Sequence, residues 1–577
     1  MHTHLDFTFL QALALSVVSM AVGAMLGLGI GLLVGAVVQW ACRNLYDVDA
    51  IAGGLSVTAA LLSAFYILPP AWKLIEVGKV LPGVAVSLYT LGLSGLVWLN
   101  ARYALRRDFA GAEGRFQWRW ALPAGATVCC VLASLALSSR TYGSDDAIEG
   151  DPNVLLITVD TLRRDHVSAY GESLANTPHM DALAKRGVLF LNAVTPTPET
   201  APAHATMLTG LHPLRHGVFS NGGSLIRGVP TVAEILEGEG YATGAFLSAY
   251  ALDSITGLDR GFEVYDDDLS PLRGFSELLV SDVLSKLIFR IGHPERYAWL
   301  LERDGADTVD IAGGWIEARG DKPWFAWVHL FEPHAPYEAP GAVVDHRALI
   351  ANPAHAYTDE EREALSVQYA QEVERVDGLV GELLESLEGT GAVERTIVVL
   401  TADHGEQLGE HGIDFHHRGL YDEVLRVPLI LAAPGVAPAE VAQQVRLMDI
   451  TPTLLGEIHL EPLERSEGAS LIGLVSGERE ASMSCSLMGR TPEIGGGRLF
   501  GLRTSEAKFI LHPELGEEAL YNLVDDPKEQ KNVADDQPEA CTQGRMMAQR
   551  EHESWANKAR RLEPETHERL EALGYVE

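Results

Sequence analysis

The sequence predicts an α/β protein, built on a mostly parallel sheet with helices on both faces and preceded by an all-α transmembrane region. Three observations indicate this architecture. Long apolar stretches fill the first 139 positions. From residue 152 onward, short apolar runs alternate with helical patterns. Polar side chains follow two of these runs at the point where each run ends, which is where open parallel sheets bind their ligands.

The transmembrane region is expected to hold about four helices within residues 1–139. Each of its apolar stretches reaches the ~20 residues that cross a bilayer. They lie at about 8–38, 50–69, 80–99 and 119–138. The connection at 100–118 is rich in arginine, and the positive-inside rule places such a loop in the cytoplasm. We therefore expect a multi-pass protein of the cell or inner membrane.

The fourth span then leads outward, through a polar linker at 140–151, to residues 152–577 on the extracytoplasmic side. The apolar stretches carry no Asp, Glu or Lys that would indicate transport, so anchoring is their expected role.

Charge divides the chain at the same place. Residues 1–150 hold nine Lys or Arg and nine Asp or Glu, so the rest carries the whole formal charge of −35. Such acidity excludes nucleic acid as a partner, because phosphate neutralisation needs a basic face. It also repels anionic substrates at long range, so local cations and a metal must capture any anionic ester. Of the five cysteines, only Cys485 and Cys541 lie in the acidic part, where they could form a disulfide.

The elements of the α/β region follow from periodicity. Residues 154–159 form a continuous Val, Leu and Ile run, as expected of a strand buried on both faces. A helix at 231–239 opens on Thr231 and closes near Gly240. By the same arguments, strands are expected at 154–159, 188–193, 242–247, 324–331, 396–401 and 428–433, and helices at 180–186, 231–239, 306–319, 360–387 and 451–458. This region is expected to end near 460, and shorter patterns at 461–577 predict a small α+β subdomain.

Two strand ends carry groups that suit a metal. Asp160 follows the first strand, where a lone Asp would ordinarily be a cap or turn residue. Asp403-His404 follows the strand at 396–401, and Gly405 allows a tight turn after it. Carboxylates with one imidazole suit a hard or borderline divalent cation. A third segment, Thr200-Ala-Pro-Ala-His204, offers a hydroxyl that would by itself be an ordinary helix N-cap.

Taken together, these segments resemble the sulfatase family of the alkaline phosphatase superfamily, over about 152–577. Met207-Leu-Thr-Gly210 fits the family pattern Leu-Leu-Thr-Gly, and the following residues to Gly217 continue the match. The resemblance implies that Thr200 holds the nucleophile position, where sulfatases carry the Cys or Ser that becomes formylglycine. Because no Cys lies near Thr200, a Cys-derived formylglycine is excluded there. Residues 499–512 and 519–528 resemble the paired strands of the family's C-terminal subdomain, and 565–575 its closing helix.

The resemblance also implies a set of site residues. The expected ligands of one divalent metal ion, whether Ca, Mg, Mn or Zn, are Asp160, Thr200, Asp403 and His404. The expected catalytic residues are Thr200, His416, His334 and His204, and the expected substrate-binding residues are Asn221, His417 and His329. The Asp-x-x-x-His pattern of a second, alkaline-phosphatase-type zinc site is missing, which is why one metal is expected.

Several of these assignments leave an alternative open. His204 stands where sulfatases place Arg, so sulfate recognition is expected to differ. Asn221 stands where related hydrolases place an oxygen-binding Asn, but Asn-Gly is also a turn sequence. His416 and His417 cannot be told apart by sequence. Thr161 stands where many sulfatases have a second Asp.

Three functions fit this pattern. The first is a metal-dependent hydrolase of sulfate, phosphate or phosphonate esters, acting on a small-molecule, glycan or lipid ester. The second is a phospho-group transferase resembling lipoteichoic acid synthases or phosphoethanolamine transferases. The third is an inactive membrane-anchored binding protein. A Thr ester cannot expel its own sulfate as a formylglycine hydrate does, so water or an acceptor must attack it, which favours phosphoryl chemistry.

Overall fold

The computed structural model describes residues 151–171, 173–269, 302–338, 341–350, 352, 355–415, 418–463, 465–479, 484–491 and 497–572, with side chains as far as 558. They all fall in one compact unit, formed by Gly143–Leu269 and Leu301–Glu577. The transmembrane helices expected at 1–139 lie outside the described residues, as does the linker up to residue 150. Within the described part of the chain, no helix combines the length and apolarity needed to cross a bilayer.

The core is an eight-stranded sheet with the order β10-β2-β9-β7-β1-β6-β4-β5. Its strands are β1 (Asn153–Val159), β2 (Val188–Phe190), β4 (Ala242–Leu247), β5 (Val264–Asp266), β6 (Trp324–Leu330), β7 (Thr396–Ala402), β9 (Leu429–Ala432) and β10 (Ala439–Val441). The strands from β7 to β5 run parallel, whereas β9 is antiparallel to both β7 and β2. The expected α/β class, with a mostly parallel sheet, is confirmed.

Register brings the ends of the central strands together. Val159, at the end of β1, is paired with Ala402 of β7 and with Leu330 of β6. Every residue of these three strands is buried, which explains their unbroken apolar sequences. The polar residues that follow them therefore meet at one edge of the sheet.

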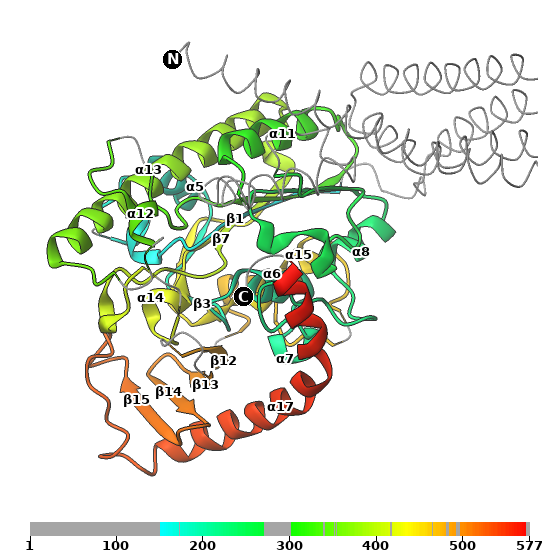
Figure 1. The fold of residues 1–577 in the computed structure, drawn as a ribbon. Coiled ribbons are helices and arrows are strands. Elements are labelled where there is room, and N and C mark those ends of the chain that lie inside the picture. The colour runs from blue at the N-terminus through cyan, green and yellow to red at the C-terminus, as the bar shows by residue number, and fades with distance from the viewer. Residues whose placement is uncertain are drawn as a thin grey trace, which may run out of the picture. The chain divides into compact units, whose positions relative to one another are not determined.

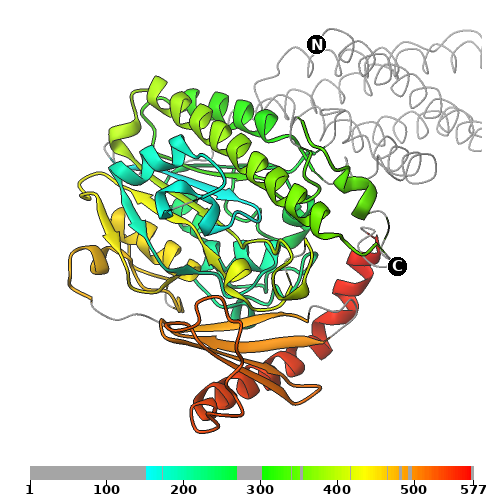
Figure 2. The same cartoon turned by 90° about the vertical axis from the view of Figure 1, so that its left-hand side faces the viewer.

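Helices cover both faces of this sheet (Figures 1 and 2). On one face, α5 (Pro178–Arg186), α11 (Gly305–Glu317) and α13 (Asp359–Gly389) pack together. On the other lie α6 (Thr200–Thr209), α8 (Val232–Gly238) and α15 (Ile450–Glu457). Short helices α7 (Pro213–His216), α12 (His346–Ile350), α14 (Asp422–Leu425) and α16 (Ile472–Val475) fill connections.

One expected strand proved to be two. Residues 188–193 divide into β2 and β3 (Ala193–Val194), which belong to different sheets. The backbone N–H of Leu191 still bonds to Val441 in the β10 ladder, but the chain then turns, and β3 pairs with β8 (Arg426–Val427) and β11 (Val445–Arg446). A continuous apolar run cannot reveal this turn, because the residues on both sides of it are buried.

The C-terminal part is a four-stranded antiparallel sheet with one long helix (Figure 1). Its strands are β12 (Cys485–Arg490), β13 (Arg498–Arg503), β14 (Ala507–His512) and β15 (Glu517–Asn522). Helix α17 (Cys541–Ala572) packs on β13 and β14 and begins well before the expected closing helix. Cys485 and Cys541 are both free and buried, so they do not form a disulfide.

Buried ion pairs join this sheet to the α/β region. Arg503 donates to both oxygens of the Asp422 carboxylate, at 2.9 and 2.7 Å. The Lys508 ammonium lies 2.6 Å from Asp422 and 2.8 Å from Glu529. Although burial opposes ionisation, the adjacent charges of Lys508 and Arg503 lower the pKa of Asp422. We call these four residues the junction cluster.

Candidate active site

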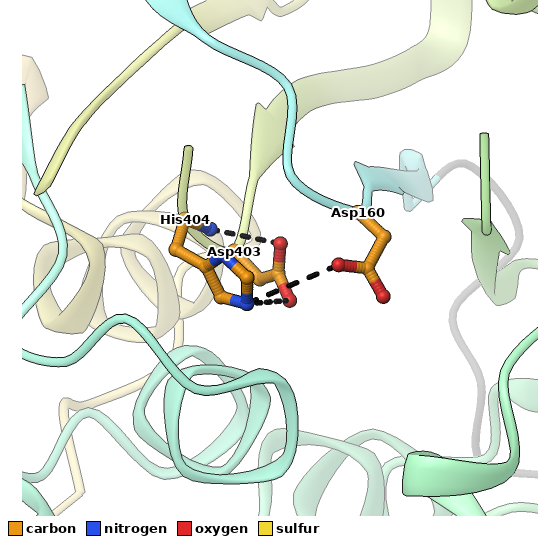
Figure 3. A group of neighbouring side chains, drawn as sticks. All are labelled: Asp160, Asp403 and His404. Atoms are coloured by element: carbon orange, nitrogen blue, oxygen red, sulfur yellow. Dashed lines mark hydrogen bonds and ion pairs between the residues drawn. The ribbon is translucent and has the colours of Figure 1, made fainter. Parts of the chain in front are cut away.

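Three expected metal ligands meet where β1 and β7 end (Figure 3). The Nε2 atom of His404 lies 3.9 Å from Asp160 Oδ1 and 3.5 Å from Asp403 Oδ2. One potential ligand atom from each of the three residues lies within 4.8 Å of the others. All three side chains are buried. The group therefore forms a compact site with two carboxylates and one imidazole.

The chemistry of this group fits a divalent cation. Asp160 Oδ1 and Asp403 Oδ2 have no hydrogen-bond donor among the described residues, although both atoms are buried. Burial, together with the charges of Asp403 and Glu406, raises the pKa of Asp160 well above its usual value. Burial likewise raises the pKa of Asp403 to about 6. Two buried acids without donors are costly unless a cation or protons compensate them.

His404 is oriented as a ligand. Its Nδ1 lies 2.9 Å from the carbonyl oxygen of Gly405, which can only accept, so Nδ1 carries the proton. Burial lowers the pKa of His404 to about 4, so the ring is neutral near pH 7. This leaves the lone pair on Nε2, the atom that faces the two carboxylates.

The loop after β1 is held by contacts that the sequence did not indicate. Thr161 adopts a left-handed conformation with φ of +54°, which is uncommon for a β-branched residue. Its N–H donates to Asp403 Oδ1 at 3.2 Å, and its carbonyl accepts from the Tyr369 hydroxyl at 2.7 Å. Thr161 thus stands in the Asp-Asp position but contributes its backbone, which orients the Asp403 carboxylate.

Thr200 is the first residue of helix α6 and is buried. It is not the N-cap, because that position belongs to Glu199, whose side chain makes no capping bond. Within the described part of the chain, no group bonds to the Thr200 hydroxyl. The ordinary N-cap alternative is therefore wrong.

Asn221 supplies the missing cap from another loop. Its Oδ1 accepts from the backbone N–H of Ala201 at 3.0 Å. This contact orients the Asn221 side chain beside the start of α6. Its Nδ2 group has no printed acceptor in the described residues, so it is available to a substrate oxygen.

His204 lies next to these groups, but both of its ring nitrogens are engaged. Nδ1 donates to the carbonyl of Thr200 at 2.8 Å and lies 3.9 Å from Asp403 Oδ2. Nε2 lies 3.0 Å from the Thr158 hydroxyl, which in turn accepts from Trp327 Nε1 at 2.9 Å. Because that hydroxyl can donate its one proton to Nε2, the network is satisfied by a neutral His204. Burial also lowers the pKa of His204. In this arrangement His204 positions the Thr200 turn and has no proton to give to a substrate.

Thr158 and Trp327 were missed at the sequence level. A polar Thr on the otherwise apolar β1 strand, two residues before Asp160, was the signal available for the first. Nothing in the sequence points to the second, because a Trp in a buried strand is ordinary core.

The other expected histidines divide into two groups. His329, at the end of β6, is fully buried with Nε2 3.7 Å from Asp160 Oδ2, and its ring lies 5.0 Å from that of His204. His334, on the loop after β6, is half-buried, stacks on Phe331, and its Nδ1 lies 2.6 Å from the Ala335 carbonyl. His416 and His417 lie outside the described residues, so their expected roles stay predictions.

Family comparisons agree with this geometry. Residues 152–459 match the family model described as Sulfatase, and residues 409–554 match N-sulphoglucosamine sulphohydrolase, C-terminal. The chain belongs to the sulfatase family. It is accordingly a sulfatase-like ester hydrolase.

Similar proteins include an ulvan-active sulfatase of Formosa agariphila, which is 31% identical over 66% of this chain and 77% of its own length. A choline-sulfatase of Rhizobium meliloti is 26% identical over 67% of this chain and 83% of its own. A Δ4,5-hexuronate-2-O-sulfatase of Bacteroides thetaiotaomicron is 26% identical over 67% and 85%.

Solved structures support the fold. The phosphonate monoester hydrolase of Agrobacterium radiobacter superposes with a TM-score of 0.55 at 24% identity, over 71% of this chain and 96% of that one. A 2-O glycosaminoglycan sulfatase superposes with a TM-score of 0.53 at 23% identity, over 67% and 88%. The α/β region is thus alkaline-phosphatase-like, as the resemblance implied.

Proposed function

We propose that this protein is a membrane-anchored, metal-dependent hydrolase of sulfate, phosphate or phosphonate esters that uses Thr200 as its nucleophile. The observation that carries the proposal is the placement of Thr200. Its backbone carbonyl and Asp403 Oδ2 both lie beside Nδ1 of His204, at 2.8 and 3.9 Å, so the start of α6 adjoins the three-ligand group.

The donor set suits one divalent ion, held by Asp160, Asp403 and His404 with the Thr200 oxygen as the expected fourth ligand. When bound, this ion would supply a Lewis acid that polarises the ester and lowers the pKa of the Thr200 hydroxyl. The N-terminus of α6, capped at Ala201 by Asn221, presents backbone N–H groups to the anionic ester.

Thr200 Oγ would attack sulfur or phosphorus in line, forming a Thr ester as the leaving oxygen departs. His334 or His416 would give that oxygen its proton. His204 keeps the Thr200 turn in place as a neutral ring. Because Thr lacks the second hydroxyl of a formylglycine hydrate, the ester must then be displaced by water or by an acceptor hydroxyl.

The test uses the full chain in detergent, supplied separately with Ca, Mg, Mn or Zn. Turnover is measured on an aryl sulfate, an aryl phosphate, a phosphodiester and a phosphonate monoester. Thr200→Val keeps the shape of the side chain but removes the hydroxyl, and we expect kcat to fall by at least about 10³-fold. Thr200→Ser, which keeps the hydroxyl, should retain most of the activity. Equal kcat values for wild type and Thr200→Val would refute the nucleophile assignment.

A phospho-group transferase is the second candidate, because the Thr ester requires an external acceptor. Its mark would be turnover that depends on an added lipid or glycan hydroxyl, with the group recovered on that acceptor. Metal binding without turnover under any of these conditions would indicate a binding protein instead.

Membrane anchoring is proposed from the apolar stretches in residues 1–139 and the arginine-rich connection at 100–118. We propose that the sulfatase-like part lies on the extracytoplasmic side. A reporter enzyme that is active only outside the cytoplasm, fused after residue 145, should be active in cells. An inactive fusion with normal expression would reverse the topology.

A further inference from the structure

Glu199, the residue before the proposed nucleophile, holds two arginines of the C-terminal sheet. Arg498 Nη1 lies 2.7 Å from Glu199 Oε1, and Arg490 Nε lies 3.3 Å from Oε2. The Glu199 side chain is only 8% exposed. Both oxygens of its carboxylate are therefore already used by the protein.

The backbone fixes these arginines beside the start of α6. The N–H of Met488 in β12 donates to Pro196 O at 2.9 Å, which ties the strand to the segment leading into Thr200. Arg490 ends β12 and is directly opposite Arg498, the first residue of β13. Like charges directly opposite in an antiparallel pair destabilise it, so this pair needs an anion nearby.

Arg418 adds a third positive charge. The N–H of Gly419 donates to the Arg490 carbonyl at 2.9 Å, so the segment that carries Arg418 lies against the end of β12. Burial and the charge of Arg490 lower the pKa of the Arg418 guanidinium, and Glu199 acts in the opposite direction. No carboxylate of the described residues forms an ion pair with Arg418.

The charges around Glu199 do not balance. Three guanidinium groups face a single carboxylate, in a chain with a formal charge of −35. Arg498 is mostly buried, at 13%, and its bond to Glu199 accounts for it as a structural clamp. Arg490 is 45% exposed and uses only Nε toward Glu199, so its terminal N–H groups remain for a ligand.

We propose that Arg490 and Arg418 form a subsite for a second anionic group, a carboxylate or a sulfate, carried by the substrate next to the ester that Thr200 attacks. This inference deepens the proposed function and rests on it for the identity of the reacting ester. Guanidinium groups bind carboxylate and sulfate oxygens through paired N–H donors. The subsite also explains how a strongly acidic protein would capture a polyanionic substrate that its surface repels at long range.

The experiment compares three probes that share one scaffold: 2-naphthyl sulfate, 6-carboxy-2-naphthyl sulfate and 6-sulfo-2-naphthyl sulfate. The metal-loaded full chain is assayed as wild type, Arg490→Gln, Arg418→Gln and the double variant. Arg550→Gln, an exposed arginine on α17, is the matched control. The probes differ slightly in reactivity, but comparing each ratio of kcat/KM between variants cancels that difference.

In the wild type, the kcat/KM of one or both dianionic probes should exceed that of 2-naphthyl sulfate by about tenfold or more. The ratio should fall severalfold in each single variant and approach one in the double variant. The kcat/KM for 2-naphthyl sulfate itself should change less than about twofold, as should every ratio in Arg550→Gln. The probe that loses most identifies the second group as carboxylate or sulfate. A wild-type ratio near one, or a ratio unchanged in the double variant, would overturn the proposal.

A second measurement separates this inference from the proposed function. Thr200→Val, which should not turn the probes over, is titrated with each probe by naphthyl fluorescence, with and without the two arginine substitutions. Tighter binding of a dianionic probe that disappears with the arginines supports the subsite even if no ester is hydrolysed by the wild type. Equal Kd values for all probes in Thr200→Val would overturn the subsite even if turnover is found.

Discussion

The site at the ends of β1 and β7 and the junction cluster are both buried and charged, but their charges are arranged in opposite ways. In the junction cluster, two carboxylates meet one ammonium and one guanidinium at hydrogen-bond distance. At the site, Asp160 and Asp403 lie beside the buried Glu406, and their nearest basic groups are imidazoles whose pKa values burial lowers.

The pKa values report this difference directly. Burial opposes ionisation in both places, yet the pKa of Asp422 is lowered and that of Asp160 is raised. The protein compensates its own charges where they hold two parts of the chain together. At the site it leaves carboxylate oxygens without donors, which is the arrangement expected where a cation from outside completes the cluster.

The largest effect is expected from removing one of these charges at the site. Asp160→Asn keeps the shape of the side chain but removes its negative charge and weakens it as a ligand. We expect kcat to fall by at least about 10³-fold and the rise in Tm on adding metal to disappear. The metal-free variant should be as stable as the wild type, or more stable by about 1 kcal/mol, because a buried unpaired charge is gone. Calorimetry with and without metal, beside turnover, measures all three; an undiminished Tm rise would show that Asp160 is not a ligand.

The same substitution at the junction cluster should have the opposite effect on stability. Asp422→Asn leaves Lys508 and Arg503 buried with too little negative charge, at an expected cost of about 3–5 kcal/mol in the free energy of unfolding. Asp359→Asn, whose carboxylate is 98% exposed beside Arg362, is the matched control and should cost at most about 0.5 kcal/mol. Urea unfolding of the metal-free proteins measures both. If Asp160→Asn destabilised the protein as much as Asp422→Asn, the contrast between the two clusters would be wrong.

A smaller effect is expected from acid. Because the pKa of Asp422 is lower in the folded state than the value of about 3.9 in an unfolded chain, the unfolded chain takes up a proton first as pH falls. The stability that Asp422 contributes is therefore complete above about pH 4 and is lost below it. The wild type should lose stability below pH 4 more steeply than Asp422→Asn. Tm values of the metal-free proteins across pH 3–6 test this; parallel curves would show that Asp422 is not stabilised as an anion.

Much of the sheet could be predicted because burial writes a simple pattern. The runs that became β1, β4, β6 and β7 are continuous and apolar, and each lies within one residue of its expected start or end. The turn between β2 and β3 could not be seen, since both short strands are equally buried. The antiparallel direction of β9 depends on its pairing with β7 and β2, which a single strand sequence does not encode.

The site was predictable only in part. Asp160, Asp403 and His404 follow strands whose ends parallel pairing must bring together, so their meeting could be expected from the sequence. The state of His204 could not, because it depends on Thr158 and Trp327, which come from two neighbouring strands. The capping of α6 by Asn221, 20 residues away, replaced a local Thr cap that the sequence made equally plausible.

By itself, the sequence determined the α/β class, the family and the identities of the groups that can hold a metal, because hydrophobic periodicity and ligand chemistry are properties of short segments. Only the tertiary structure decided which buried charges are compensated, which nitrogen of each histidine carries its proton, and that arginines of the C-terminal sheet reach Glu199. Those properties depend on distances of a few ångströms between residues up to 299 positions apart. Such distances are set by how the sheets and helices pack, and no local pattern in the chain records them.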